Sequence, residues 1–146
     1  MSAVWSLILS TDDGRFVRMR FIDKECDPRV LSPLTLAFVG DAVFELMVRE
    51  SVVCTANQPA GKLHSLSVKM VKASAQASAA KRILPLLTES ELSVYKRGRN
   101  AHPSHTPKNA DVADYRAATG LEALFGFLYL KGEKQRLSEL FEASGE

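Results

Sequence analysis

Cysteine is scarce in this sequence, which has two such residues, Cys26 and Cys54, among 146. Two cysteines form neither a disulfide framework nor the spacing of a metal site, and they indicate a reducing compartment. Long apolar runs are also missing, because the run at residues 3–9 is too short to span a bilayer and no basic residue precedes it. We therefore expect a cytoplasmic protein without a membrane-spanning segment.

Acidic residues are absent from two long stretches, residues 51–88 and 92–110. The basic residues of these stretches are Lys62, Lys69, Lys72, Lys81, Arg82, Lys96, Arg97, Arg99 and Lys108. Clustered lysine and arginine on a protein with a net charge of only +2 are typical of a surface that binds a polyanion such as nucleic acid. A solvated helix face that lacks acids by chance explains the same pattern, so charge alone leaves both interpretations open.

The remaining composition, 46% hydrophobic and 25% charged, is that of an ordinary globular domain. Apolar residues recur at helical spacing, and the sequence shows no strand-rich core or repeat. Helices are expected at residues 32–51, within 62–84, at 88–98, at 111–132 and around 137–141. The sequence thus predicts an all-α helical bundle at residues 27–146, preceded by an extension at residues 1–26 with no assigned role.

Two of the expected helices are mostly apolar and still carry acids in their interior. Asp41 and Glu45 lie four residues apart on the first, and Glu122 lies on the second. If these helices pack together, Asp41 and Glu122 converge on one Mg²⁺, which prefers carboxylate oxygens. Gly40 and Gly126 would let the two backbones approach closely at that level. Acids in helices also lie on solvated faces or pair with lysine, and spacing alone does not exclude this.

The segments "LAFVGDAVFE" at residues 36–45 and "LEALFGFLYL" at residues 121–130 resemble the two signature helices of the ribonuclease III catalytic domain. With "RGRN" at 97–100 and "PKNADVADYR" at 107–116, the chain is similar to the bacterial Mini-ribonuclease III family. That family has the catalytic domain without a double-stranded-RNA-binding domain. The resemblance implies a two-fold homodimer that uses Mg²⁺ to cleave double-stranded RNA into 5′-phosphate products. It also implies maturation of both ends of the 23S ribosomal RNA precursor.

Carried over by position, the resemblance makes Asp41 and Glu122 the catalytic, metal-binding carboxylates. Larger ribonucleases III have two further acids, at the positions where this chain has Ala37 and Thr119. This departure leaves the number of metal ions per site open. Glu45 either orients a water molecule or serves as a structural ion-pair partner.

Without a separate RNA-binding domain, the catalytic domain must itself contact the phosphates. The residues expected to bind RNA are Arg97, Arg99, Asn100, Lys108, Asn109 and Arg116. For each of them, and for the two asparagines above all, a hydrogen bond that stabilises the loop is the alternative role. The histidines His64, His102 and His105 have no metal-ligand spacing and are assigned no catalytic role.

Three functions remain distinguishable at this point. The first is an endoribonuclease, which the intact pair Asp41 and Glu122 favours. The second is a noncatalytic double-stranded-RNA-binding module in ribosome assembly, which Ala37 and Thr119 keep open. The third, a plain helical interaction domain, leaves the basic stretches unexplained. A ribosomal protein that presents the RNA is a further candidate partner.

Overall fold

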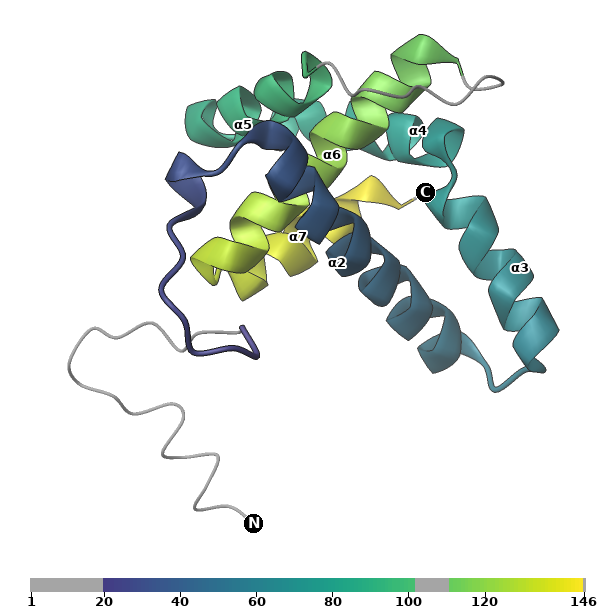
Figure 1. Cartoon of the computed structure of the whole chain (residues 1–146). Helices are drawn as coiled ribbons and strands as arrows, with labels where there is room; N and C mark the ends of the chain where they lie inside the picture. The colour runs from purple at the N-terminus through teal and green to yellow at the C-terminus, as the bar shows by residue number, and fades with distance from the viewer. Residues whose placement is uncertain (1–19, 102–110, 146) are drawn as a thin grey trace.

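The computed structural model describes residues 20–101 and 111–145 (Figure 1). Within these ranges the chain is helical and forms no strand, which confirms the predicted all-α class. The α-helices are α2 (Pro33–Thr55), α3 (Ala60–Val71), α4 (Ala73–Ile83), α5 (Glu89–Arg99), α6 (Val112–Lys131) and α7 (Lys134–Ser144), and the short 3-10 helices are η1 (Pro28–Val30) and η2 (Leu84–Leu86). The two predicted RNA contacts Lys108 and Asn109, and two of the histidines, lie outside the described residues.

Local capping signals explain where the helices begin and end. The Ser32 hydroxyl accepts a hydrogen bond from the backbone N–H of Thr35 at the start of α2. Thr88 opens α5 with a capping box that includes Glu91, and Asp111 caps α6. Gly132 ends α6 in the left-handed conformation, with φ of 85°, which glycine adopts without strain. The expected start of α2 is therefore confirmed, although this helix continues to Thr55 rather than ending near residue 51.

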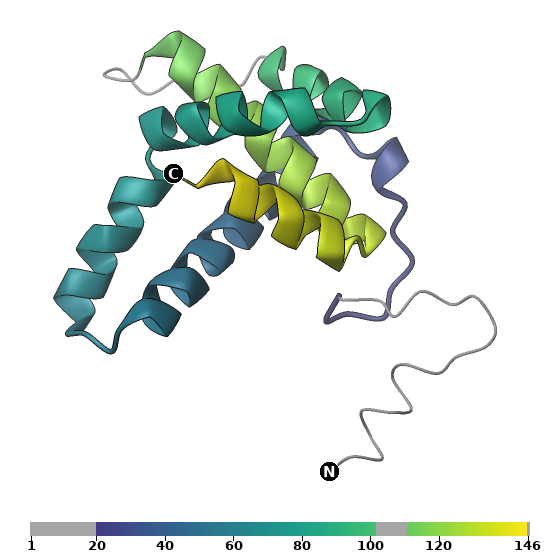
Figure 2. The same cartoon turned by 180° about the vertical axis from the view of Figure 1, so that it is seen from behind.

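Helix α6 is the centre of the bundle. Helices α2, α4, α5 and α7 all pack against it, and Figure 2 shows α7 in front of α6 when the molecule is seen from behind. Every residue from Ala118 to Leu128 is buried except Glu122, which is partly buried. A helix that is apolar around its whole circumference belongs in a core, so its one carboxylate lies in an unusual environment.

Helix α2 has one buried face and one exposed apolar face. The residues of α2 that are fully buried are Leu36, Ala37, Gly40, Phe44, Val48 and Val52. On the opposite side Leu34, Phe38 and Leu46, spaced four and eight residues apart, are exposed, with Phe38 exposed by 82%. The mostly apolar sequence of α2 predicts a largely buried helix, and this prediction is wrong for the single chain, because the second face is exposed.

Helices α2 and α3 together form an arm. They run antiparallel from a turn at residues 56–59, and this end of the pair projects away from the other helices (Figures 1 and 2). Of the one or two helices predicted within residues 62–84, the structure has two, α3 and α4, which are divided at Lys72, where the backbone is extended. Across the described residues, none of the helices combines the length and apolar character needed to cross a membrane.

Candidate active site

The site is built where α2 and α6 cross. Gly40 and Gly126 lie at this crossing, and a Cβ atom added to Gly40 would overlap the backbone carbonyl of Glu122. A Cβ added to Gly126 would overlap the carbonyl of Leu36 in the same way. The predicted close approach at these two glycines is confirmed. It brings the residue that follows Gly40, Asp41, to the level of Glu122 on α6.

Asp41 and Glu122 act on each other electrostatically. Burial, together with the nearby charge of Asp41, raises the pKa of Glu122 to about 7. Burial also raises the pKa of Asp41, with a second contribution from the charge of Glu45. Asp41 itself lies at the exposed edge of the crossing, whereas Glu122 lies deeper. Because the two partly buried carboxylates repel each other, binding of a shared cation or proton between them is favoured.

The structure adds one residue that sequence reasoning missed. Gln76 of α4 is only 2% exposed, and its side-chain amide donates a hydrogen bond to the Glu122 carboxylate. This hydrogen bond lowers the pKa of Glu122 and opposes the two effects that raise it. In the sequence, Gln76 is a single glutamine within the alanine-rich segment "ASAQASAA". No residue at helical spacing from Gln76 indicates that its side chain contacts Glu122.

The donor set fits a hard divalent cation with few protein ligands. In the part of the chain that the structure describes, no lysine or arginine forms an ion pair with Asp41 or Glu122. The same residues contain no group of three or more His, Cys, Asp or Glu side chains that could hold a metal. Mg²⁺ is often held by one or two carboxylates and keeps most of its waters, so the pair Asp41 and Glu122 suits it.

The neighbouring positions clarify the two departures from the larger ribonucleases III. Ala37 is buried, and the Thr119 hydroxyl donates to the backbone carbonyl of Tyr115 within α6, at 3.0 Å. Neither residue adds a ligand to the carboxylate pair. Glu45 forms an ion pair with Arg49, with 2.8 Å between the Glu45 Oε1 and Arg49 Nη2 atoms. This contact confirms the second of the two roles expected for Glu45, that of a structural ion-pair partner.

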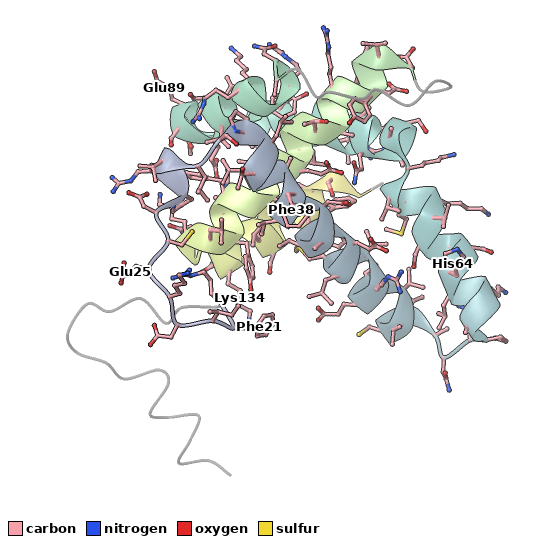
Figure 3. The ribbon with its side chains drawn as sticks, in the orientation of Figure 1. Phe21, Glu25, Phe38, His64, Glu89 and Lys134 are labelled. Carbon is pink, nitrogen blue, oxygen red and sulfur yellow. The ribbon has the colours of Figure 1, made fainter. Side chains whose placement is uncertain are left out.

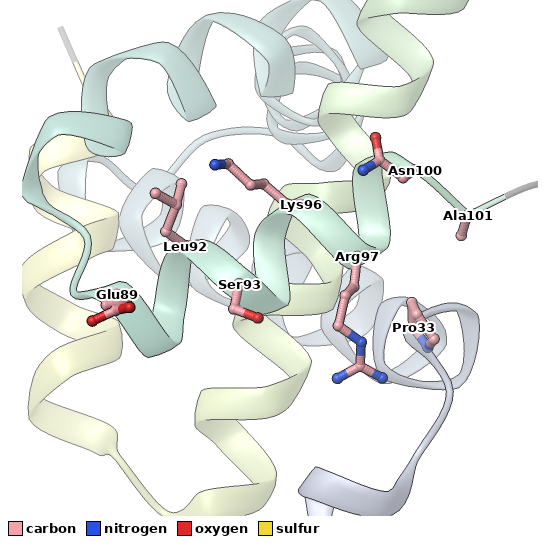
Figure 4. A pocket seen from close by; sticks show the side chains of 8 residues that line it. All are labelled: Pro33, Glu89, Leu92, Ser93, Lys96, Arg97, Asn100 and Ala101. Carbon is pink, nitrogen blue, oxygen red and sulfur yellow. The ribbon is translucent and has the colours of Figure 1, made fainter.

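The predicted RNA-binding residues of α5 divide between two sides of that helix. Arg97 and Asn100 line an open cavity of about 530 Å³ together with Pro33, Glu89, Leu92, Ser93, Lys96 and Ala101. Figure 4 shows Arg97 extending toward Pro33, at the start of α2, and Lys96 extending the other way. Arg99 instead lies over the ring of Tyr95, 6.0 Å from its centroid, and donates a hydrogen bond to the Asn100 side chain.

The remaining basic residues are spread over several elements. Arg116 is exposed on the second turn of α6, and Lys62, Lys69, Lys72 and Lys81 are exposed on and around α3 and α4. His64 also lies on α3 (Figure 3). Arg82 is different, since its guanidinium donates to the backbone carbonyl of Ser144 at 2.7 Å and so joins α4 to the end of α7. Part of the basic stretch therefore stabilises the fold.

Comparison with known proteins bears on this site. Residues 34–133 match the family described as Ribonuclease III domain. The chain is 53% identical over 114 residues to the Mini-ribonuclease 3 of a Thermoanaerobacter species, covering 78% of this chain and 80% of that protein. It is 45% identical over 120 residues to the Mini-ribonuclease 3 of Symbiobacterium thermophilum, covering 82% and 92%. A crystal structure of a Fusobacterium nucleatum protein superposes with a TM-score of 0.72 at 30% identity, covering 81% of this chain and 94% of that one.

Proposed function

The chain belongs to the ribonuclease III family, in its Mini-ribonuclease 3 branch, and is an endoribonuclease of double-stranded RNA. We propose that Asp41 and Glu122 are its catalytic residues and hold Mg²⁺. The observation that carries this proposal is the crossing of α2 and α6 at Gly40 and Gly126, which brings two mutually repelling carboxylates together.

The reaction is hydrolysis of a phosphodiester bond. Water attacks phosphorus, the bond to the 3′ oxygen breaks, and the products are a 5′-phosphate and a 3′-hydroxyl. Mg²⁺ supplies an acidic centre that favours ionisation of water and stabilises charge on the phosphate. Asp41 and Glu122 would hold that cation where α2 and α6 cross, and Gly40 and Gly126 let the two backbones approach closely there.

RNA binding is proposed for Arg97, Arg99, Asn100 and Arg116, with Lys108 and Asn109 of the segment that links α5 to α6. The support is charge and exposure, because Arg97, Asn100 and Arg116 are exposed and the whole stretch 92–110 lacks acids. Contacts of this kind go to phosphates and sugars, so they would hold a duplex by shape rather than by base sequence.

A two-fold homodimer is proposed through the exposed apolar face of α2. This face carries Leu34, Phe38 and Leu46, and Figure 3 shows Phe38 on the outer side of the helix. A second copy of the same chain is the proposed occupant, because one carboxylate pair can cut one strand whereas a duplex presents two strands related by two-fold symmetry. Asp41 lies on α2 beside this face, so dimerisation would place two sites across the duplex.

The proposed substrate is the 23S ribosomal RNA precursor in the cytoplasm, with a ribosomal protein presenting it. The test is to incubate the purified chain and Mg²⁺ with a precursor transcript, alone and bound to ribosomal proteins, and to map the new ends by sequencing. An unrelated duplex of equal length is the control. Cuts at both ends of the mature RNA, enhanced by a ribosomal protein, are expected. Equal cutting of the unrelated duplex at scattered positions would contradict this substrate.

A further inference from the structure

Gln76 is the most deeply buried polar side chain among the described residues, with 2% of its surface exposed. It lies in α4, where its neighbours Ala77, Ala79 and Ala80 are buried and small and let the helix pack closely on α6. Burying a carboxamide destabilises a protein unless its polar atoms are hydrogen-bonded. Its partner here is the Glu122 carboxylate.

The direction of this hydrogen bond follows from the chemistry of the two groups. An ionised carboxylate only accepts hydrogen bonds, so the Gln76 Nε2–H group must donate. The hydrogen bond links α4, which carries neither Asp41 nor Glu122, to Glu122, the more buried of these two carboxylates. Mutation of a side chain that orients a metal-binding group in this way typically costs roughly 10- to 100-fold in metal affinity or activity.

We propose that Gln76 is a positioning residue for the nuclease reaction, whose amide fixes the Glu122 carboxylate so that it faces Asp41 and shares a divalent cation with it. This inference rests on the proposed function of Asp41 and Glu122. It also explains how two carboxylates suffice where Ala37 and Thr119 supply no ligand: a buried amide restricts the rotamers of one carboxylate before the cation arrives.

Gln76→Met tests the proposal, because methionine keeps the length and packing of glutamine and removes the donor. Mg²⁺ alone, without RNA, is titrated calorimetrically into the variant and the wild type. Cleavage of a long double-stranded RNA is then measured against Mg²⁺ and RNA concentration. We expect Mg²⁺ affinity to fall by roughly 10-fold or more. We also expect kcat to fall, with KM for RNA unchanged and part of kcat restored by excess Mg²⁺.

Two further variants make the result unambiguous. Gln76→Asn keeps the amide group on a side chain that is one methylene shorter. This variant is expected to bind Mg²⁺ as weakly as Gln76→Met, although the two substitutions change the packing of α4 in different ways. Ser78→Ala is the matched control on α4, because its exposed hydroxyl donates only to the Ser74 carbonyl. It is expected to behave as the wild type does.

The outcomes separate the inference from the function on which it rests. Wild-type Mg²⁺ affinity and kcat in folded Gln76→Met and Gln76→Asn would overturn the positioning role and leave the catalytic pair intact. Equal loss of RNA binding and Mg²⁺ binding in Ser78→Ala would also overturn it, since the effect would then belong to the helix. A wild-type chain that cleaves RNA without binding Mg²⁺ would overturn both the metal site and the role of Gln76.

Discussion

Gly40 of α2 lies directly against the backbone carbonyl of Glu122 in α6, so closely that any side chain at residue 40 would overlap that oxygen. The contact sets the depth at which the two helices cross. It also explains the position of the acid that follows: Asp41 lies at the edge of the crossing, where its charge acts on Glu122. Backbone packing and the geometry of the proposed catalytic pair therefore depend on the same glycine.

The first prediction concerns this glycine. Gly40→Ala is expected to destabilise the chain by about 1–3 kcal/mol or more, because the added methyl group forces the two helices apart at a backbone contact. The measurement is the free energy of unfolding from urea titration. Gly61→Ala is the matched control, since a Cβ at that position of α3 meets nothing within 4 Å. It should be neutral or stabilising by up to about 1 kcal/mol. Equal stability of the two variants would contradict close packing at Gly40.

The second prediction concerns pH and Glu122 in metal-free protein. The pKa of Glu122 is about 7 in the folded chain, above its ordinary value of 4.5, so the folded state binds the proton more tightly than the unfolded state. Its contribution to stability is therefore full below about pH 4.5 and is lost as the pH rises through 7. Glu122→Gln removes this loss and should be more stable than the wild type at pH 8, by roughly 3 kcal/mol at most.

This difference is measured by chemical unfolding in EDTA across the pH range. The two proteins should have nearly equal stability near pH 4.5 and diverge above it. Mg²⁺ should stabilise the wild type at pH 8 and leave Glu122→Gln almost unchanged, because a cation compensates the buried charge. A constant difference between the proteins at every pH would show that ionisation of Glu122 does not affect folding.

A third prediction addresses the exposed face of α2. Phe38→Asp places a charge where we propose that two copies meet, so the variant should sediment as a single chain at concentrations where the wild type is a dimer. Leu86→Asp is the control, because Leu86 is also an exposed apolar residue, 52% exposed, but lies on η2. The same sedimentation for all three proteins would place the dimer interface elsewhere or exclude a dimer.

Arg97 provides the fourth prediction. If its guanidinium contacts a phosphate, Arg97→Ala should weaken binding to duplexes of any sequence and reduce the slope of log affinity against log salt by about one contact. Lys134→Ala is the control, since Lys134, at the start of α7 (Figure 3), is an exposed lysine that does not line the cavity beside Arg97. Binding is measured by fluorescence anisotropy at several salt concentrations with a catalytically inactive background. An unchanged slope for Arg97→Ala would remove this residue from the phosphate contacts.

Sequence reasoning succeeded where the signals are local. Ser32, Thr88 and Asp111 satisfy free backbone N–H groups of the first turn, and such caps can be read from a few neighbouring residues. The two glycines, Gly40 and Gly126, also predicted the close approach of α2 and α6, because a residue without a side chain lets two backbones pack together. These features positioned Asp41 and Glu122 correctly relative to each other.

It failed where the answer depends on what packs against a helix. Apolar periodicity predicted the helix at residues 32–51 but not the exposure of Phe38, since sequence does not reveal whether a second apolar face is covered by the same chain. Gln76 was missed for a similar reason. Its contact with Glu122 joins residues 46 positions apart through the packing of α4 on α6, and no local pattern records such a contact.

The most direct test of the central claim compares the wild type with Asp41→Asn on one long double-stranded RNA, with Mg²⁺ and with chelator. Cleavage and binding are measured in the same samples. We predict that only the wild type with Mg²⁺ cleaves, that both proteins bind the duplex, and that the variant loses roughly 100-fold or more in rate because a metal-holding carboxylate is gone. Cleavage by Asp41→Asn at the wild-type rate, or tight binding without cleavage by either protein, would contradict the account.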